Sequence, residues 1–519
     1  MTNARTISQS LPPSEDTLDC IVRRNAVFRP GGIAFRHRDR VVDWLTFDRL
    51  VSGCAFELAR RDIVPGDRIG YLVPNSIDAY VAMFGAMRAG AMIVPFSTML
   101  DTASLATLLA NAECKLLLAD RQLADLAASV SQNVTIAGLA EVTGKEAEHF
   151  ASRARADAPA SIIYSSGTTG LPKGAVHTHA ARALAGLMSA FGFDYQSRSK
   201  TLLTTPPYTN GSWMMVLPSL VSGSELILAS KFDVDDVFDV VAMHAPTHAF
   251  FVPTQFQALV EAKSYSNDVF APFRCLITAG APMPEKLKQQ ILADAPGRLY
   301  ELWGLTEVVA TISSPWELHD SSNSVGRPLP LSEIRLIDED ENEIDLPGTG
   351  EIVARSQYQM VGYWRQPELN ASIQWTSSDG TSFMRTGDIG EIDAQGRLYI
   401  RGRIKDMIIS GGINVYPADI EDKLREHPAI SDAAVIGIAD EKWGETPVAF
   451  VRLRQGSDDT PENILHWSKS HLAKFQRVSD IIVSADDFPR NTLGKVLKNQ
   501  LRDHYHALVI DRKTKGVRS

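Results

Sequence analysis

Short apolar runs alternate with helical patterns along most of this chain, and this alternation limits the possible folds more than any other feature. Near-continuous apolar strands separated by helices are typical of parallel sheets that helices cover on both faces. The sequence therefore predicts an α/β fold. The expected strands cover residues 160–164, 226–228, 249–252, 274–278 and 298–303.

The pattern changes after about residue 325, where short strands such as EIRLID, GEIVARS and GRLYIRG are separated by Gly, Asp and Pro turns. These strands predict a smaller antiparallel region, a distorted β-barrel. A boundary near residues 402–405 would divide the chain into a large N-terminal domain, 1–402, and a small mobile α+β C-terminal domain, 403–519. Helices are expected at residues 46–61, with Thr46 as the cap, and at 76–90, 417–426, 461–472 and 497–505.

Composition excludes several classes of protein. The 519 residues are 44% apolar, which suffices for two or more domains. No apolar run is long enough to span a membrane, and the ends of the chain show neither a secretion signal nor a peroxisomal Ser-Lys-Leu tail. The net charge of −10 disfavours nucleic acid as the main partner, and a homodimer stays an open option. The widely spaced cysteines indicate reduced thiols and a cytoplasmic location; they are Cys20, Cys54, Cys114 and Cys275.

A segment rich in hydroxyls and glycines, YSSGTTGLPKGA at residues 164–175, follows an apolar strand. Backbone amides and hydroxyls can surround phosphate oxygens while a lysine offsets their charge. The segment is not a Walker A loop, because the GxxxxGK[ST] pattern is absent. A flexible surface turn is the alternative, and the density of hydroxyls beside Pro-Lys-Gly argues against it. The residues expected to bind phosphate are Ser165, Ser166, Gly167, Thr168, Thr169, Gly170 and Lys173.

Four further segments carry side chains that suit a nucleotide. Taken alone, each has a structural explanation: a buried tryptophan at a strand end, an aspartate in a turn, a strand before a capped helix, and a solvated lysine near the C-terminus. The segments read YELWGLTE at 300–307, RTGDIG at 385–390, GRIKDMIISGGINVYPADIE at 402–421 and PRNTLGKVLKNQLR at 489–502.

Together with the phosphate loop, and in this order, these segments resemble the acyl-adenylate-forming superfamily, in its acid–CoA ligase branch. The resemblance covers about residues 20–503. It implies an AMP-forming acid–thiol ligase that makes an acyl-adenylate from ATP and then a thioester with CoA, with Mg²⁺ as the metal. The protein's task in such chemistry is positioning and charge stabilisation more than covalent catalysis.

The resemblance also implies roles for single residues. Trp303 would flank adenine, Thr306 would contact the α-phosphate, and Glu307 would hold Mg²⁺, which prefers oxygen ligands. Asp388 would bind both ribose hydroxyls, since a carboxylate can accept two hydrogen bonds, and Arg403 would also reach the ribose. The remaining residues of the implied ATP site are Gly280, Ala281, Pro282, Glu301, Leu302 and Gly304.

The two half-reactions need two geometries. Lys495 matches the catalytic lysine of adenylate formation, and Lys405 falls at the hinge of the family pattern. Gly411 and Gly412 match the loop past which the pantetheine arm of CoA enters, where a side chain would narrow the tunnel. Rotation about Lys405 would therefore exchange Lys495 for the glycine pair.

The acid itself is the least defined partner. The segment PPYTNGSW departs from the family pattern, because Thr209 stands where many CoA ligases carry histidine. Amino-acid-activating relatives carry an aspartate in this region, so an amino acid is disfavoured. Apolar side chains favour a fatty, aryl or alicyclic acid, although they could equally belong to the core. The implied acyl pocket comprises Tyr208, Thr209, Trp213, Phe251, Thr278, Ala279, Gly280 and Asn414.

Other functions stay open at this point. The main alternative is an acyl-adenylating enzyme that loads a carrier protein, which the lack of a fused carrier domain disfavours. A luciferase-like oxygenase would share the first step only. A non-catalytic nucleotide-binding protein would be expected to lack Lys495, Glu307 or Asp388, and all three are present.

Overall fold

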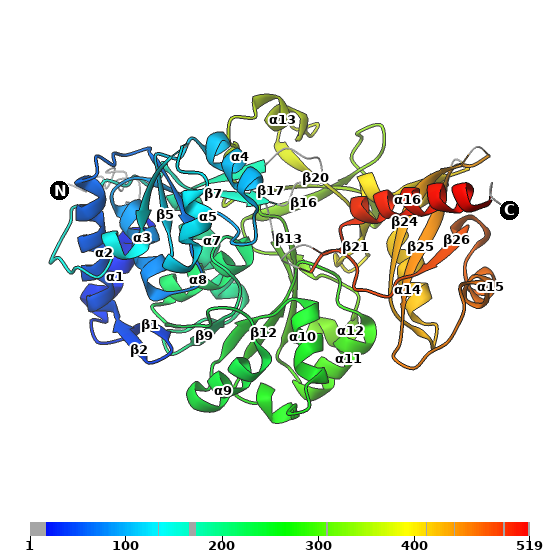
Figure 1. Cartoon of the computed structure of the whole chain (residues 1–519), viewed down its shortest axis with the longest axis horizontal. Coiled ribbons are helices and arrows are strands. Elements are labelled where there is room, and N and C mark those ends of the chain that lie inside the picture. Colours follow the sequence, from blue (N-terminus) through cyan, green and yellow to red (C-terminus); the bar gives the residue numbers. More distant parts are fainter. Residues whose placement is uncertain are drawn as a thin grey trace, which may run out of the picture.

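The computed structural model describes residues 17–132, 134–165, 173–307, 310–411, 413–440, 442–490 and 494–516. Figure 1 shows a large part built from the blue-to-green segments and a smaller part, from α14 onward, on the other side of β21. Within these residues, no helix combines the length and the apolar character that crossing a bilayer requires.

A nine-stranded sheet, in the order β15-β14-β13-β12-β11-β9-β10-β1-β2, carries one half of the large part. Its six central strands run parallel, and β2, β14 and β15 add antiparallel edges. The strands are β1 (Ile33–His37), β2 (Arg40–Asp43), β9 (Lys200–Leu203), β10 (Glu225–Leu228), β11 (His248–Phe250), β12 (Cys275–Thr278), β13 (Leu299–Gly304), β14 (Ala310–Ser313) and β15 (Arg327–Pro328). The helices between them are α8 (Asn210–Ser222), α9 (Val234–His244), α10 (Pro253–Glu261), α11 (Glu285–Asp294) and α12 (Pro315–Asp320).

A seven-stranded sheet, in the order β18-β8-β7-β4-β3-β5-β6, forms the other half. Its strands are β3 (Arg68–Leu72), β4 (Met92–Pro95), β5 (Leu116–Ala119), β6 (Thr135–Gly138), β7 (Pro159–Ser165), β8 (Lys173–Thr178) and β18 (Gly362–Tyr363). The helices are α1 (Leu18–Phe28), α2 (Trp44–Ala59), α3 (Ile77–Arg88), α4 (Thr102–Ala112), α5 (Ala124–Ala128), α6 (Leu139–Val142) and α7 (His179–Gly192). The largest apolar core draws side chains from both sheets and from α1, α2, α3 and α8.

The start of α2 corrects the sequence prediction. Asp43, not Thr46, is the cap, and its carboxylate accepts a hydrogen bond from the Thr46 backbone N–H at 2.7 Å. The threonine therefore lies inside the first turn, because the aspartate three residues earlier satisfies the free amide.

A five-stranded antiparallel sheet follows and holds part of the candidate site. It comprises β16 (Ser332–Ile337), β17 (Gly348–Ser356), β19 (Gln374–Thr376), β20 (Ser382–Ile392) and β21 (Leu398–Arg403), with α13 (Pro367–Ser372) between β18 and β19. This sheet is the small antiparallel region that the sequence predicts.

The last part of the chain has its own sheet and its own core. Both of its apolar clusters contain residues from Ile408 onward only. This separation supports the proposed domain boundary near residues 402–405. The elements are β22 (Ile408–Ser410), β23 (Ile413–Val415), α14 (Pro417–Arg425), β24 (Ile430–Asp440), β25 (Gly444–Leu453), α15 (Pro461–His471), β26 (Asp480–Val483) and α16 (Lys498–Gly516). The predicted fold class, an α/β chain with a smaller antiparallel sheet and an α+β C-terminal part, is confirmed.

Candidate active site

Asp388, Arg403 and Trp303 lie together at the junction of two sheets. Strand pairing places Asp388 of β20 opposite Arg403 of β21, and Arg403 Nε lies 2.5 Å from Asp388 Oδ1. Trp303, at the end of β13, donates from Nε1 to Asp388 Oδ2 at 2.9 Å. Burial raises the pKa of Asp388, and the charge of Arg403 opposes that shift. Asp388 Oδ1 is ion-paired with Arg403 but makes no hydrogen bond among the described residues, so this buried oxygen can still accept one.

Lys495 reaches the same place from the far side of the predicted boundary. Burial, Arg403 and Lys405 lower the pKa of Lys495 to about 8, and the charge of Asp388 opposes the shift. The neighbouring Gly494 packs on the large part, since a Cβ placed there would lie 3.3 Å from Thr254 Oγ1. The structure therefore shows the lysine-bearing segment docked against the large part.

A third and a fourth cation approach from the large part and from the connecting turn. Lys405 lies in the turn Ile404–Asp406. Burial is the main cause that lowers its pKa, and the charges of Arg403 and Lys173 lower it further. Asp406 is the second carboxylate beside this group. We call Trp303, Asp388, Arg403, Lys405, Lys173 and Lys495 the nucleotide end of the site. Its four cations outnumber its carboxylates, which suits an anionic ligand.

Glu307 and Thr306 lie on a loop that three hydrogen bonds fix in place. His177 Nε2 donates to the Thr306 carbonyl at 2.8 Å, and the Met360 N–H donates to the Glu307 carbonyl at 2.8 Å. Tyr363 Oη donates to Glu307 Oε1 at 2.9 Å. Glu307 is nearly buried, and its Oε2 makes no recorded hydrogen bond within the described chain, so that oxygen is available to a metal ion.

The phosphate loop is only framed by the described residues. β7 ends at Ser165 and β8 begins at Lys173, and these two residues pair across the strands. Ser166, Gly167, Thr168, Thr169 and Gly170 lie outside the described residues, as does Gly412.

The predicted adenine wall follows β12. Gly280 has φ +90°, and Ala281 and Pro282 after it are partly or fully exposed. Gly304 ends β13 and is exposed. Glu301 has another partner: Lys288 of α11 donates to its carboxylate at 2.5 Å and to the Ser322 carbonyl at 2.6 Å. This buried ion pair anchors β13, so a direct role of Glu301 toward ATP stays a prediction.

The residues predicted for the acyl pocket separate into three groups. Trp213 and Phe251 are 2% and 0% exposed and pack in two apolar cores, so they present no surface to a ligand here. Thr209 caps α8, where its hydroxyl accepts from the Ser212 N–H at 3.3 Å and donates to the Pro206 carbonyl at 3.0 Å. Asn414 lies apart from both, because its amide donates to Glu339 Oε1 at 2.9 Å.

Four predicted pocket residues remain, and they lie near strand ends; one of them is Gly280, which follows β12 with φ +90°. Tyr208 precedes the cap of α8 and is almost buried, and burial raises the pKa of its hydroxyl. Thr278 ends β12, fully buried, and its Oγ1 makes no hydrogen bond in the described part of the chain. Ala279 follows it and is also buried.

Five partly buried apolar side chains pack on the largest core; the sequence assigned Leu302 to the ATP site and gave Met214 as favouring an apolar acid, and it did not single out the other three. We call these residues the acid end; they are Ala185, Met188, Met214, Tyr300 and Leu302. Alternation along β13 puts Tyr300 and Leu302 on one face and Trp303 on the other. The spacing of Ala185 and Met188 along α7 was a signal in the sequence, since residues three apart share one helix face.

Comparison with known proteins decides the family. A family model described as "AMP-binding enzyme" matches residues 22–364, and one described as "AMP-binding enzyme C-terminal domain" matches residues 419–495. A long-chain-fatty-acid–CoA ligase from Mycobacterium tuberculosis is 33% identical over 89% of this chain and 92% of its own. The chain belongs to the AMP-binding enzyme family.

Two solved structures of similar proteins carry nucleotide. ATP-bound MatB from Rhodopseudomonas palustris superposes with a TM-score of 0.86 at 28% identity, over 94% of this chain and 99% of that one. The o-succinylbenzoate CoA synthetase from Bacillus subtilis in complex with ATP and magnesium ion gives 0.84 at 26% identity, over 93% and 99%. Membership of the AMP-binding enzyme family confirms both the resemblance and the predicted class, an AMP-forming acid–thiol ligase.

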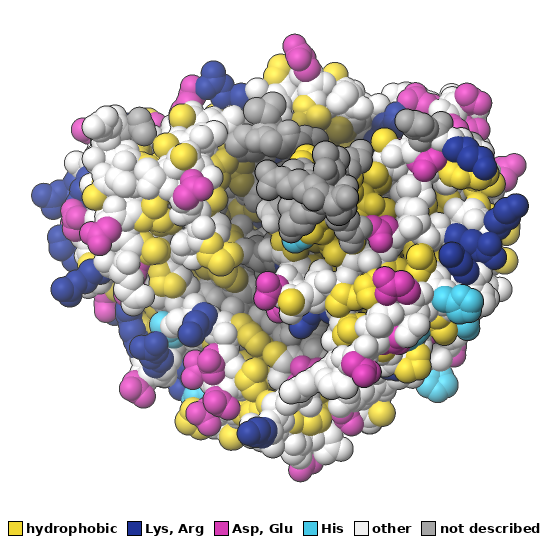
Figure 2. Space-filling model, turned by 45° about the vertical axis from the view of Figure 1, so that its right-hand side comes forward, with side chains coloured by type: hydrophobic (Ala, Val, Ile, Leu, Met, Phe, Trp, Pro, Cys, Tyr) yellow, Lys and Arg dark blue, Asp and Glu magenta, His cyan; other side chains and the backbone are white. Residues whose placement is uncertain are grey.

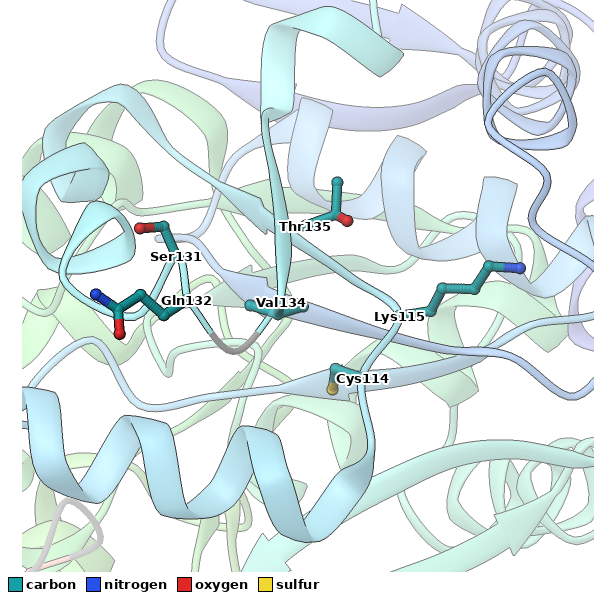
Figure 3. A pocket seen from close by; sticks show the side chains of 6 residues that line it. All are labelled: Cys114, Lys115, Ser131, Gln132, Val134 and Thr135. Atoms are coloured by element: carbon teal, nitrogen blue, oxygen red, sulfur yellow. The ribbon is translucent and has the colours of Figure 1, made fainter.

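Two other features of the surface of this AMP-binding enzyme lie outside the site residues named so far. On the face in Figure 2, hydrophobic side chains lie across the centre, whereas Lys and Arg side chains gather toward the periphery. Figure 3 shows a hollow lined by six residues: Cys114, Lys115, Ser131, Gln132, Val134 and Thr135. It lies beside β5 and β6, at the opposite edge of the seven-stranded sheet from β8, and includes none of the site residues.

Proposed function

We propose that this chain activates a hydrophobic carboxylic acid with ATP and transfers the acyl group to CoA, releasing pyrophosphate and then AMP. The observation that carries the proposal is the meeting of cations from both sides of the connecting turn. Lys173 begins β8 in the large part, whereas Lys495 follows β26 in the C-terminal part, and both lie beside Lys405. A triphosphate is the ligand class that needs such a group.

In the first step, a carboxylate oxygen of the acid bonds to the α-phosphorus, and the bond from that phosphorus to the pyrophosphate oxygen breaks. Negative charge gathers on the phosphoryl oxygens during this exchange. Lys495 would stabilise that charge, and the Thr306 hydroxyl would position the phosphate. The loop that carries Thr306 is held by His177, which limits movement of the hydroxyl.

The described residues fit the nucleoside and the metal. Asp388 Oδ1 is buried and makes no hydrogen bond among the described residues, so it can accept one from a ribose hydroxyl. Glu307 would hold Mg²⁺, which when bound neutralises phosphate charge. The described residues contain no cluster of three or more His, Cys, Asp or Glu side chains, so the remaining metal ligands would be phosphate and water oxygens.

In the second step, the thiol of CoA attacks the acyl carbon and AMP leaves. Lys495 must then withdraw, and the turn Ile404–Asp406 is the place where the chain can rotate. Gly411 has φ +61°, and a Cβ there would lie 2.8 Å from the Trp443 ring, so only glycine suits this position. The close packing of Gly411 on Trp443 accounts for glycine at this position, and the path for the pantetheine arm past it rests on the family pattern.

The proposed class of acid, a hydrophobic one, follows from the apolar residues assigned to the acid end; Arg182 and Asn210 are their polar neighbours. The relatives support this class, since one is named for long-chain fatty acids and another for o-succinylbenzoate. The buried capping role of Thr209 supplies no charge that could hold an ammonium group. We therefore favour fatty, aryl or alicyclic acids over amino acids.

A panel of acids tests the proposal. The enzyme is supplied with ATP, Mg²⁺ and either CoA or a pantetheinyl carrier protein, and AMP release and thioester mass are measured. We expect acyl-CoA from at least one hydrophobic acid. Adenylate without thioester, or a thioester on the carrier protein alone, would contradict CoA as the acceptor.

Two further proposals concern the state of the protein. A cytoplasmic location is supported by four cysteines that are all free thiols. A homodimer is proposed as well, and light scattering during size-exclusion chromatography distinguishes it from a monomer.

A further inference from the structure

Two buried arginines in the large part have very different surroundings. Arg88 is 2% exposed, and its guanidinium donates to Asp48 Oδ1 at 2.7 Å and lies 3.5 Å from Asp19 Oδ2. Arg182, on α7, is 5% exposed, and its Nη1 donates to the amide oxygen of Asn210 at 2.7 Å. No carboxylate pairs with Arg182 in the part of the chain that the structure describes, and its Nη2 makes no hydrogen bond there.

This lack of a counter-charge is costly. Burial alone lowers the pKa of Arg182 to about 9, so the guanidinium is still charged at neutral pH. A charge that is buried without a partner destabilises a fold, and an apolar side chain of similar size would cost less. The arginine is therefore better explained by a ligand than by folding.

The neighbours of Arg182 offer donors toward such a ligand. Asn210 begins α8, one residue after the cap Thr209, and it is partly exposed. Because the oxygen of the Asn210 amide is engaged by Arg182, its Nδ2 group is left to donate. Burial, together with the nearby positive charge of Arg182, holds the pKa of His177 well below its usual value. The imidazole is neutral and cannot serve as a counter-ion.

The pair is separate from the nucleotide end. The charges that chiefly shift the pKa of Lys495, Lys405 and Asp388 are those of the nucleotide end and its immediate neighbours, and Arg182 is not among them. Arg182 and Asn210 lie instead on α7 and α8, the helices that supply Ala185, Met188 and Met214 to the acid end. A ligand group that meets Arg182 would therefore be held from the α7–α8 side of the site.

We propose that Arg182 and Asn210 bind a second carboxylate on the acid, so that the preferred substrate is a dicarboxylic acid with an apolar body. The guanidinium fork matches the two oxygens of a carboxylate, and Asn210 Nδ2 adds a donor beside it. This inference rests on the proposed function and narrows its substrate class.

The test compares chain-matched mono- and dicarboxylic acids in the wild type and in Arg182→Met. We expect the ratio of kcat/KM for the dicarboxylic acid to that for the monocarboxylic acid to fall about ten- to a hundredfold in the variant, the range for a lost hydrogen bond to a charged group. The monocarboxylic acid is the internal reference, because it lacks the group that Arg182 is proposed to bind. Arg182→Lys, which keeps the charge but loses the fork, should give a smaller fall. An unchanged ratio in Arg182→Met would overturn the proposal.

Melting temperatures give a readout that does not need turnover. The dicarboxylic acid should raise the melting temperature of the wild type more than its monocarboxylic match, and Arg182→Met should abolish that difference. Without ligand, Arg182→Met should melt no lower than the wild type, because it removes an unpaired charge. The matched control, Arg88→Met, should melt lower, because buried Asp19 and Asp48 lose their ion pairs with Arg88 and Asp48 keeps only its pair with Arg23. Equal shifts with both acids in the wild type would refute the second-carboxylate site, whereas failure of every acid to release AMP would refute the proposed function instead.

Discussion

The nucleotide end and the acid end of this site are built on different principles. The nucleotide end draws its cations from both sides of the connecting turn: Lys405 lies near Arg403 and Lys173, and Lys495 lies near Arg403 and Lys405. The residues assigned to the acid end come from α7, α8 and β13 of the large part alone, and they are apolar, with Arg182 and Asn210 as their polar neighbours on α7 and α8. Under the proposed function, the chemistry shared by all substrates would be completed by docking of the C-terminal part, whereas the choice of acid would be made within the large part alone.

Replacing Lys495, the lysine that the C-terminal part contributes, should lower activity most, and the loss should be confined to the step at the nucleotide end. Lys495→Ala should slow adenylate formation about 10²–10³-fold, the loss typical of one well-placed charge-stabilising donor. Thioester formation from supplied acyl-adenylate should be spared. Pyrophosphate exchange and CoA transfer are measured separately, with the exposed Lys469→Ala as the control. Equal loss of both half-reactions would show that Lys495 is not specific to adenylate formation.

Asp388→Asn should weaken the same end by removing a charge-assisted acceptor. We expect kcat/KM for ATP to fall about ten- to a hundredfold, because a hydrogen bond to a charged group is lost and Arg403 is left unpaired. KM for the acid should stay constant. Asp393→Asn is the control, since that carboxylate bonds Arg397 at 2.8 Å outside the site. A change in KM for the acid, with kcat/KM for ATP unaffected, would show that Asp388 acts on the acid and not on the nucleotide.

The pH profile sharpens the contrast further. Lys495 is charged below its pKa of about 8 and neutral above it. In the steady-state reaction, kcat/KM should therefore fall about tenfold per pH unit above that value, since kcat/KM reports groups of the free enzyme. Lys495→Arg should move the fall to higher pH, whatever its absolute rate. A wild-type profile that stays flat to high pH would contradict the assignment.

The smallest effect is expected at the acid end. Met214→Ala should shift the preference toward bulkier acids by less than about tenfold, because a few methylene groups of pocket space change substrate selectivity only modestly. KM for ATP should not change. A loss of ATP binding in this variant would mean that the two ends are not independent.

The sequence predicted the nucleotide end better than the acid end, and the reason is physical. Asp388, Arg403 and Lys495 lie on short segments whose glycines and charges are visible locally, and the structure brings these three side chains together. The expected strand at residues 274–278 is observed as Cys275–Thr278, because an apolar run between turns determines a buried strand.

The acid end depends on packing between distant elements, which local patterns do not reveal. Trp213 and Phe251 looked suitable for a pocket, yet Trp213 packs against Tyr80 and Phe84, and Phe251 packs against Phe256. Arg182 carried no signal in the sequence, because an arginine in a helix is usually solvated. Only its burial without a carboxylate distinguishes it.

A reversible cross-link between the two parts tests the central claim most directly. A Cβ on Gly494 would lie 3.3 Å from Thr254 Oγ1, so cysteines at both positions are close enough for a disulfide when Lys495 is docked. Because Gly494 has φ +79°, which strains any other residue, the Gly494→Cys single variant is the control. The account predicts that the oxidised Thr254→Cys, Gly494→Cys enzyme still exchanges pyrophosphate but forms no acyl-CoA until it is reduced. Full acyl-CoA formation by the oxidised enzyme would show that Lys495 need not leave, and would contradict the account.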